Sequence, residues 1–285
     1  MDKKAFSENI ILRHFSGRRL FFLHAFASNR SLVLLWKLIL KFSEVQHVVE
    51  VGANKGEISK SFCEASTERS AWAFEANPFV FSNFTAVNVP ANMKVYNLGM
   101  GSGIEKTMKL KVPIRNRSRN SGNGSFLEQV EHNDYQTFEV IMSTIDKALQ
   151  ENQYRGNFAL WIDVEGFTLD VLLGASNALE SKQVIFIFLE MESRALWKSG
   201  ANSKVIDEYL KKFGYRRLAR DFEYPGQFNC IYTNQKISLP ILIFCLLYLI
   251  WEKFLFLVSI FLLPAEIVMK ILKRFIHMNQ KLTEK

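Results

Sequence analysis

The feature that most constrains the fold of this chain is the stretch at residues 48–57, Val-Val-Glu-Val-Gly-Ala-Asn-Lys-Gly-Glu. Its first four residues are apolar and β-branched except for Glu50, a pattern typical of a central parallel strand. Gly52 and Gly56 allow the backbone to turn sharply and to approach a ligand, because neither carries a Cβ atom. Residues 57–66 follow with apolar side chains at helical spacing. The stretch therefore predicts a strand, a glycine turn, and a helix whose free N–H groups face the strand end.

The acid in this strand distinguishes two classes of ligand. A carboxylate at Glu50 disfavours the pyrophosphate of a dinucleotide beside the turn and favours a cationic ligand. The turn also lacks the third glycine of the fingerprint found in nicotinamide-dependent enzymes. S-adenosylmethionine, which carries a cationic sulfonium, is therefore the favoured cofactor, and a nicotinamide-dependent Rossmann oxidoreductase is the alternative.

Three further predicted strands also end in acids. The second ends at Glu75, about 20 residues after the glycine turn, a spacing at which an acid reaches ribose hydroxyls. Two later strands end at Asp163, with Glu165 two residues on, and at Glu190. Ligands of open α/β sheets bind beyond the carboxyl ends of the strands. We therefore expect these acids to meet Glu50 at one site, although a helix cap or a structural hydrogen bond is the alternative for any one of them.

A polar, basic loop at residues 113–125 contains Arg115, Arg117 and Arg119. A loop of this length in a compact domain is often a lid or a binding loop. We expect Arg115 and Arg117 to contact the substrate, and a solvated surface loop is the alternative.

The positive charge of the chain is concentrated at its two ends. Residues 1–43 hold eight Lys/Arg and two Asp/Glu (+6), residues 236–285 hold seven and three (+4), and residues 44–235 hold 21 and 23 (−2). A nucleic-acid enzyme usually carries its basic charge around the site, so this distribution argues against a nucleic-acid partner. Basic, apolar ends favour an anionic membrane surface. Three cysteines without metal-type spacing indicate a reducing compartment, and no His–acid cluster predicts a metal site.

The N-terminal extension, residues 1–43, contains a predicted amphipathic helix at residues 31–42. One face of this helix is apolar and is formed by Leu32, Leu35, Trp36 and Ile39. Packing of this face on the sheet of the domain is the favoured interpretation, and contact with a membrane is the alternative.

The C-terminal segment, residues 236–285, is predicted to be hydrophobic and membrane-associated. Residues 237–251 are almost wholly apolar, Glu252 and Lys253 interrupt, and residues 254–264 are apolar again. A membrane span needs about 20 apolar residues, which neither part reaches alone. A re-entrant hairpin, a single span that accommodates the charged pair, and a buried dimer interface remain open. Membrane attachment is favoured because a soluble surface rarely tolerates such a patch.

Residues 44–235 resemble the FkbM family of S-adenosylmethionine-dependent methyltransferases. The family's Asp/Glu-Val-Gly-Ala-Asn-x-Gly pattern matches residues 50–56, and its Phe-Glu-Pro-like element matches residues 74–76. Its Ile-Asp-Val-Glu-Gly element matches residues 162–166, and Val-Leu-x-Gly-Ala follows at residues 171–175. The resemblance implies the α/β fold of class I (Rossmann-like) methyltransferases, with a seven-stranded, mostly parallel sheet whose last strand is antiparallel. Here an apolar helical C-terminal extension would be added to it.

The resemblance also implies O-methylation, most often of a sugar or polyketide hydroxyl, and a set of cofactor contacts. These are Glu50, Gly52, Ala53, Asn54 and Gly56 at the methionine and sulfonium side, Glu75 at the ribose, followed by Ala76 where proline is usual, and Asn97 and Gly99 at the adenine. Trp161 stands where many members carry lysine.

The sequence as a whole predicts an S-adenosylmethionine-dependent O-methyltransferase that acts on a glycan or lipid-linked sugar at the membrane, with its catalytic domain in the cytoplasm. Asp163 is the expected general base and Glu165 the second candidate, because a hydroxyl nucleophile gains from a positioned base. Glu190, Arg115 and Arg117 are expected to bind the substrate. The alternatives are the oxidoreductase and a non-catalytic, membrane-attached binding protein.

Overall fold

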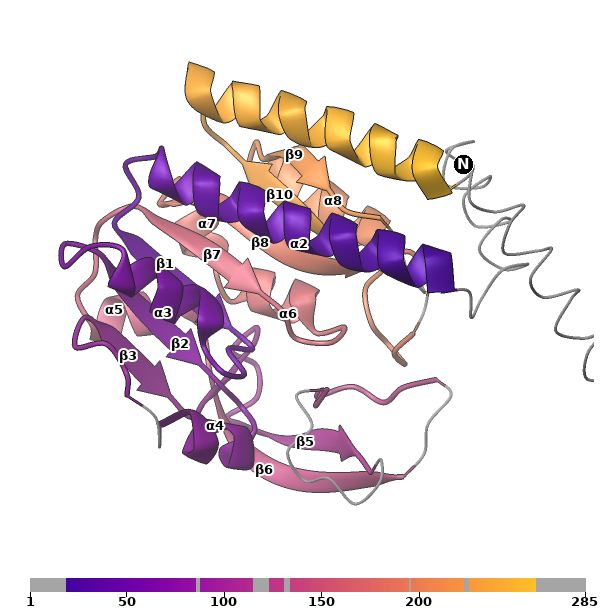
Figure 1. Cartoon of the computed structure of the whole chain (residues 1–285). Helices are drawn as coiled ribbons and strands as arrows, with labels where there is room; N and C mark the ends of the chain where they lie inside the picture. Colours follow the sequence, from indigo (N-terminus) through magenta and orange to yellow (C-terminus); the bar gives the residue numbers. More distant parts are fainter. Residues whose placement is uncertain are drawn as a thin grey trace, which may run out of the picture.

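The computed structural model describes residues 19–85, 88–114, 123–130, 134–194, 196–222 and 226–259. Its centre is a seven-stranded sheet with the order β3-β2-β1-β7-β8-β10-β9 (Figure 1). The strands are β1 (His47–Val51), β2 (Ser70–Phe74), β3 (Met93–Tyr96), β7 (Phe158–Ile162), β8 (Val184–Glu192), β9 (Arg216–Arg220) and β10 (Gln227–Thr233).

The sheet is mostly parallel. The pairs β1–β2, β2–β3, β1–β7 and β7–β8 are parallel, whereas β10 runs antiparallel to both β8 and β9. The predicted sheet, including its antiparallel last strand, is confirmed. Strands β1, β2, β7 and β8 therefore end at one edge, and the predicted acids lie at or near it.

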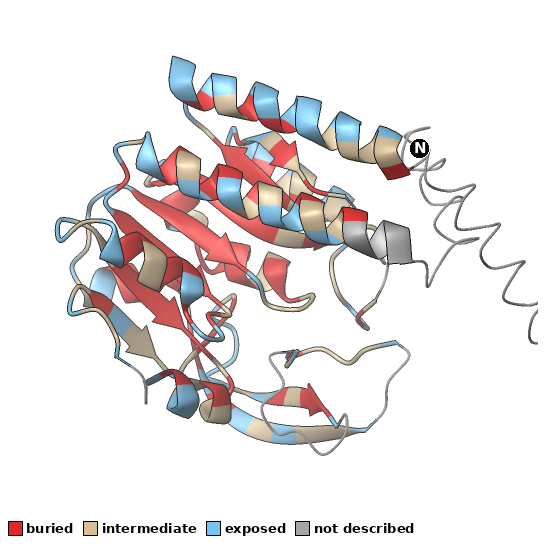
Figure 2. Ribbon diagram, viewed as in Figure 1, coloured by how far each residue is buried: buried red, intermediate tan, exposed pale blue. Residues whose placement is uncertain are grey.

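Helices cover both faces of the sheet (Figure 1). One face carries α2 (Arg19–Lys41), α3 (Glu57–Glu64) and a C-terminal helix (Leu239–Ser259), and the other carries α5 (Ile145–Glu151), α6 (Thr168–Leu173), α7 (Ser176–Glu180) and α8 (Ser203–Lys212). Strand β1 shows why both faces need cover: Val49 and Val51 join the core under α5–α8, whereas Val48 joins the core under α2 and α3. The central strands of the main sheet are consequently red in Figure 2, whereas the edge strand β3 is mostly tan.

A smaller three-stranded sheet has the order β4-β6-β5 and lies at the end of the molecule near the carboxyl edge of the main sheet. It consists of β4 (Gly99–Met100), β5 (Thr107–Pro113) and β6 (Tyr135–Ser143), with α4 (Pro78–Thr85) nearby. Strands β5 and β6 pair antiparallel, with Thr107 opposite Ile141 and Pro113 opposite Tyr135. Residue Ser125 pairs with Lys111 of β5, which brings the end of the basic loop back to this sheet.

The packing of α2 explains the tryptophan at position 161. The Trp161 ring stacks on Phe188 with centroids 3.7 Å apart, and Trp36 of α2 meets its edge at 6.0 Å. Trp161 is therefore part of the apolar core beneath α2, where a lysine would place a charge without water. The four residues of the predicted apolar face of this helix are all buried, and the helix begins earlier than predicted, at Arg19.

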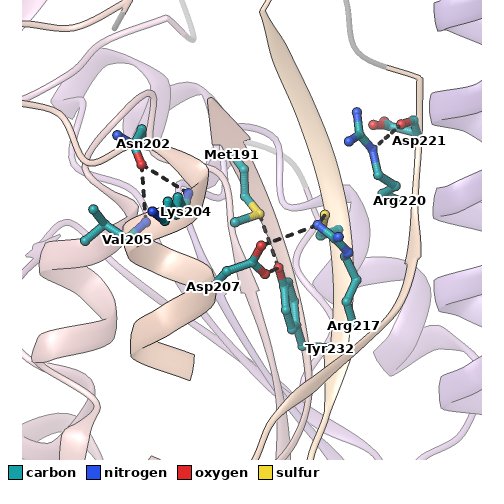
Figure 3. A network of polar contacts seen from close by, with 10 residues as sticks. Met191, Asn202, Lys204, Val205, Asp207, Arg217, Arg220, Asp221 and Tyr232 are labelled. Carbon is teal, nitrogen blue, oxygen red and sulfur yellow. Dashed lines mark hydrogen bonds and ion pairs between the residues drawn. The ribbon is translucent and has the colours of Figure 1, made fainter. Parts of the chain in front are cut away.

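A polar network fixes α8 to the antiparallel edge of the sheet (Figure 3). The Tyr232 hydroxyl donates a hydrogen bond to the Asp207 carboxylate, whose other oxygen lies 3.6 Å from Arg217 Nη1. At the start of α8, the Asn202 side chain accepts from the N–H groups of the residues that follow it, as an N-cap does. These contacts stabilise the edge of the sheet away from the carboxyl-edge acids.

Candidate active site

Two glycines shape the turn after β1. Gly52 has φ 77°, its N–H donates to the Phe74 carbonyl oxygen at 3.0 Å, and a Cβ atom there would lie 1.8 Å from the Asp163 carbonyl oxygen. Gly56 has φ 65°, and a Cβ atom there would lie 2.1 Å from the Phe84 ring. Both positions therefore require glycine for backbone conformation and for close packing inside the protein.

Glu75 connects the turn to the second strand. One carboxylate oxygen accepts the Asn54 N–H at 2.7 Å and the other accepts the Asn77 N–H at 2.7 Å. Burial raises the pKa of Glu75, and these two N–H groups oppose that rise. Each oxygen of an ionised carboxylate has two acceptor positions, so each keeps one for a ligand hydroxyl. The side-chain amide of Asn97 donates to the Glu75 carbonyl oxygen at 2.7 Å and steadies the same corner.

A pocket opens at the carboxyl edge between the main sheet and the small sheet. It is lined by Val51, Gly52, Phe74, Glu75, Ala76, Asn77, Leu98, Met100, Leu110, Gly124, Ser125, Phe126, Asp163 and Val164. Four of the predicted site residues, Gly52, Glu75, Ala76 and Asp163, are thus brought together. The lining combines apolar and polar side chains, as small-molecule sites usually do.

Asp163 is the more exposed of the two acids that line this pocket. Its side chain is exposed to water in the pocket, while its backbone N–H donates to the Val51 carbonyl oxygen at 3.0 Å and fixes its position between β7 and β1. Because protein surrounds the pocket and limits bulk solvent, the pKa of Asp163 rises to about 6. A carboxylate of this kind is ionised at neutral pH and more basic than a surface aspartate.

Glu165 lies in a strained loop next to Asp163. Its φ of 49° is in the left-handed region, which a non-glycine residue rarely adopts. The loop is held by the Ser125 hydroxyl, which donates to the Glu165 carbonyl oxygen at 2.7 Å, and by the Gln227 amide, which donates to the Glu165 carboxylate at 3.3 Å. Backbone strain of this kind is typical of functional sites. Ser125 was not predicted as a site residue, and only the length of the loop that contains it indicated a role.

Glu190 and Glu192 extend the acidic cluster along β8. Burial raises the pKa of Glu190 well above its ordinary value, and the charges of Glu165, Asp163, Glu192 and Asp221 raise it further. One Glu190 oxygen has no hydrogen-bond partner within the part of the chain that the structure describes. Burial and the negative charge of Glu165 raise the pKa of Glu192 to about 7. Glu192 was missed, although its position two residues after Glu190 puts it on the same side of the strand.

Replacing Glu190 with glutamine should stabilise the fold at high pH. The unfolded carboxyl ionises near its ordinary pKa of 4.5, whereas the folded protein holds the proton to higher pH. Stability is therefore full below the unfolded pKa and falls as pH rises through the folded pKa, and Glu190→Gln removes this loss. We expect the melting temperature at pH 8 to rise by at least about 2 °C, roughly the effect of 1 kcal/mol in a protein of this size.

The matched control is Glu180→Gln on the exposed end of α7. It should leave the melting temperature unchanged at both pH 5 and pH 8. An equal gain for Glu190→Gln at both pH values would show that charge is not the cause.

Glu50 is placed differently from the other acids. Its carboxylate is 3 % exposed and accepts the Ser59 N–H of α3 at 2.9 Å, and it is absent from the pocket lining given above. Burial raises its pKa to about 7, and the charge of Asp163 contributes. The structure therefore places Glu50 behind the glycine turn, where it holds α3 against β1.

The remaining predicted residues divide into three groups. Ala53, Asn54 and Gly56 form the turn, and Gly99 begins β4, where a Cβ atom would lie 2.5 Å from Met142 Sδ. Arg115 and Arg117 lie outside the described residues. Among the residues that the structure describes, no three His, Cys, Asp or Glu side chains are grouped so that they could hold a metal ion.

The residues around the turn fit S-adenosylmethionine. The Glu75 carboxylate retains acceptor positions for a ribose diol, and Ala76 and Leu98 give the pocket an apolar wall suited to an adenine. These features belong to one continuous pocket.

Comparison with known proteins identifies the family. The model of the Methyltransferase FkbM domain matches residues 50–217. No curated protein matches the chain. Solved structures with a similar fold include the ribosomal protein L11 methylase from Lactobacillus delbrueckii subsp. bulgaricus (9% identity, 73% of this chain and 80% of that chain, TM-score 0.39). Another is the N-terminal domain of human METTL16 in complex with SAH (10% identity, 72% and 69%, TM-score 0.40).

The matched region begins at Glu50 in β1 and continues into β9, so it contains the glycine turn, Glu75 and the acidic loop at Asp163. The match excludes the oxidoreductase interpretation of the two-glycine turn. The chain therefore belongs to the FkbM family of methyltransferases, whose cofactor is S-adenosylmethionine.

Proposed function

We propose that this methyltransferase methylates a hydroxyl of a glycan or lipid-linked sugar at a membrane, with its catalytic domain on the cytoplasmic side. The observation that carries the proposal is the position of Asp163. Its carboxylate opens into the pocket that Glu75 borders, and Glu165 and Glu190 are close enough for their charges to interact within one acidic cluster.

S-adenosylmethionine supplies an activated methyl group when bound. The protein therefore has two main tasks, which are to orient the acceptor oxygen and to take its proton. Orientation can contribute about 7–11 kcal/mol, and a positioned base about 10²–10⁴-fold in rate. In the proposed mechanism an Asp163 carboxylate oxygen accepts the hydroxyl proton, since its raised pKa of about 6 leaves it ionised but basic at neutral pH. Glu165 is the second candidate for this base.

The acidic cluster also supports a neutral, polyhydroxylated acceptor. Glu190 and Glu165 carry acceptor oxygens next to Asp163, and sugar hydroxyls are donors that such carboxylates bind. Repulsion from the ionised Asp163 carboxylate would disfavour an anionic group at the reacting oxygen. A phosphate of a lipid-linked sugar would instead contact Arg115 and Arg117 of the basic loop.

The C-terminal helix supports a membrane location. Among the described residues it is the one helix long and apolar enough to cross a membrane, with a mean hydropathy of 2.3 over a window of which 17 % is buried. The three cysteines are buried and form no disulfide, which is consistent with the reducing conditions on the cytoplasmic side.

A labelling experiment tests the proposed reaction. The full-length protein is incubated with S-adenosylmethionine carrying a tritiated methyl group and with detergent-solubilised membranes from its native cells. Label should enter the organic phase, survive mild alkali that cleaves methyl esters, and be released with the sugar by mild acid. Label in protein or nucleic acid, or alkali-labile label, would contradict O-methylation of a lipid-linked sugar.

The rate of this reaction should rise with pH through the region around pH 6. A general base must be ionised to act, and enclosure in the pocket raises the pKa of Asp163 from 3.8 to about 6. Activity should therefore be low at pH 5 and reach a plateau above about pH 7. The rise between these values gives an apparent pKa that belongs to the interacting acids of the cluster together and not to Asp163 alone. A profile that is flat from pH 5 to pH 8 would show that no group of this kind takes the proton.

A further inference from the structure

The C-terminal helix is bound to α2 along its length. The Ser28 hydroxyl of α2 donates to the Glu252 carboxylate at 2.7 Å, and the Trp251 indole N–H donates to the Ser31 hydroxyl at 2.8 Å. The two helices lie side by side on one face of the sheet (Figure 1). Glu252 is thus directed at the protein, although the sequence shows it as an interruption of an apolar segment.

The inner side of this helix is attached to the catalytic domain as well. Ile241, Cys245 and Tyr248 are buried in the core beneath α2, and the Tyr248 hydroxyl donates to the Arg220 carbonyl oxygen at 3.0 Å. These contacts run through most of the helix. The helix therefore lies along the surface of the domain, and it would have to give up all of them to cross a bilayer perpendicular to that surface.

The outer side of the same helix is exposed (Figure 2), and its side chains are apolar. Six of its large side chains, Leu242, Ile243, Leu246, Leu247, Ile250 and Phe254, are each between 42 % and 65 % exposed. Helix α2 adds Phe26 and Leu34, at 48 % and 58 %. Exposed apolar side chains in this number on two neighbouring helices indicate a surface that is covered in the working protein.

A basic groove borders this face on the other side of α2. It lies between α2 and α3, has a volume of about 490 Å³, and is lined by three cationic side chains, Lys37, Lys41 and Arg69. Trp36 and Phe62 form part of its apolar floor, and none of the described residues that line it is acidic. Helix α2 itself contains no Asp or Glu from Arg19 to Lys41.

We infer that the exposed apolar side chains of the C-terminal helix and of α2 lie flat on an anionic bilayer, and that the groove between α2 and α3 holds the phosphate of an anionic lipid headgroup. Charge complementarity points to this occupant, since the cations of α2 stand beside the apolar side chains, as in helices that lie in the membrane interface. The inference builds on the proposed membrane association, but lipid binding does not depend on methyl transfer. A failure of the lipid-binding inference can therefore be distinguished from a failure of the proposed methyl transfer.

The test uses the full-length protein and sedimentation with vesicles. One set contains phosphatidylcholine alone, and in the other about a third of the lipid is phosphatidylglycerol. The protein should bind the anionic vesicles more tightly, and Lys37→Ala/Lys41→Ala should lower that affinity at least about tenfold while binding to neutral vesicles persists. The matched control, Lys147→Ala/Lys204→Ala, removes two exposed lysines from the opposite face and should change nothing.

Other outcomes would overturn the inference. If the Lys37→Ala/Lys41→Ala variant and the parent bind anionic vesicles equally well, the groove does not bind the lipid headgroup. Equal affinity for glycerol phosphate in solution and for the vesicles would identify a soluble anion as the ligand. Absence of vesicle binding together with a dimer that Leu246→Asn/Ile250→Asn dissociates would show that a second copy covers the face.

The depth of the helix gives a second, independent measurement. Single cysteines at Leu242, Ile250 and Leu257 can carry a fluorophore, because the natural cysteines are buried. A helix that lies flat should place all three probes at the same shallow depth, about 5–10 Å below the headgroups. A deep probe at position 250 with shallow probes at positions 242 and 257 would indicate a span and contradict the inference.

Discussion

Replacing Asp163 with asparagine should lower the rate of methyl transfer about 10²–10⁴-fold while the affinity for S-adenosylmethionine changes little. Asparagine is close to aspartate in shape, so the pocket should be preserved, but it cannot accept the proton of the acceptor hydroxyl. The backbone N–H of residue 163, which bonds the Val51 carbonyl oxygen, is unaffected by the change. The rate is measured in the labelling assay and the affinity by calorimetry.

Two controls sharpen this test. Glu151→Gln changes an exposed acid on α5 and should leave the rate unchanged. Glu165→Gln separates the two candidate bases, because it should lower the rate less than Asp163→Asn if Asp163 takes the proton. A normal rate for Asp163→Asn, or a larger loss for Glu165→Gln, would assign the base to another group.

Replacing Glu75 with alanine should weaken the binding of S-adenosylmethionine at least about 100-fold, because hydrogen bonds to a charged group contribute about 1.5–3 kcal/mol each. Two effects add. The variant loses the acceptor oxygens for the ribose, and it also loses the carboxylate that holds the Asn54 and Asn77 N–H groups at 2.7 Å. Calorimetry measures the dissociation constant, and a melting curve establishes that the variant is folded.

The control for this prediction is Glu105→Ala, which removes an exposed acid from the segment before β5. Its affinity for the cofactor should equal that of the parent protein. A folded Glu75→Ala variant that binds S-adenosylmethionine normally would show that Glu75 serves only to shape the turn.

Local patterns in the sequence were sufficient to predict the sheet and most of the acidic cluster. Apolar runs that end in a carboxylate identify buried parallel strands, and such strands end at one edge of a sheet. Glu75 and Asp163 consequently line one pocket, and Glu190 is close enough for the charge of Asp163 to raise its pKa. The two glycines were also identified. The groups that leave no room for a Cβ atom there, the Asp163 carbonyl oxygen and the Phe84 ring, come from distant parts of the chain.

Other features depend on contacts that one sequence does not reveal. Glu50 is in the predicted strand, but alternation along β1 directs its side chain to Ser59 under α3 instead of into the pocket. Ser125 reaches the loop at Glu165 because its segment pairs with β5, a register that no local pattern fixes. Glu252 and Lys253 are adjacent in sequence, yet one faces Ser28 and the other is exposed. A charge that interrupts an apolar segment can therefore belong to a helix–helix contact.

The most direct test of the proposed site is a calorimetric titration of the full-length protein, in detergent, with S-adenosylmethionine. The pocket at Gly52, Glu75 and Asp163 predicts one binding site per chain with a micromolar dissociation constant. A folded protein that shows no binding would contradict the assignment of this pocket as the cofactor site and, with it, the roles proposed for the acids around it.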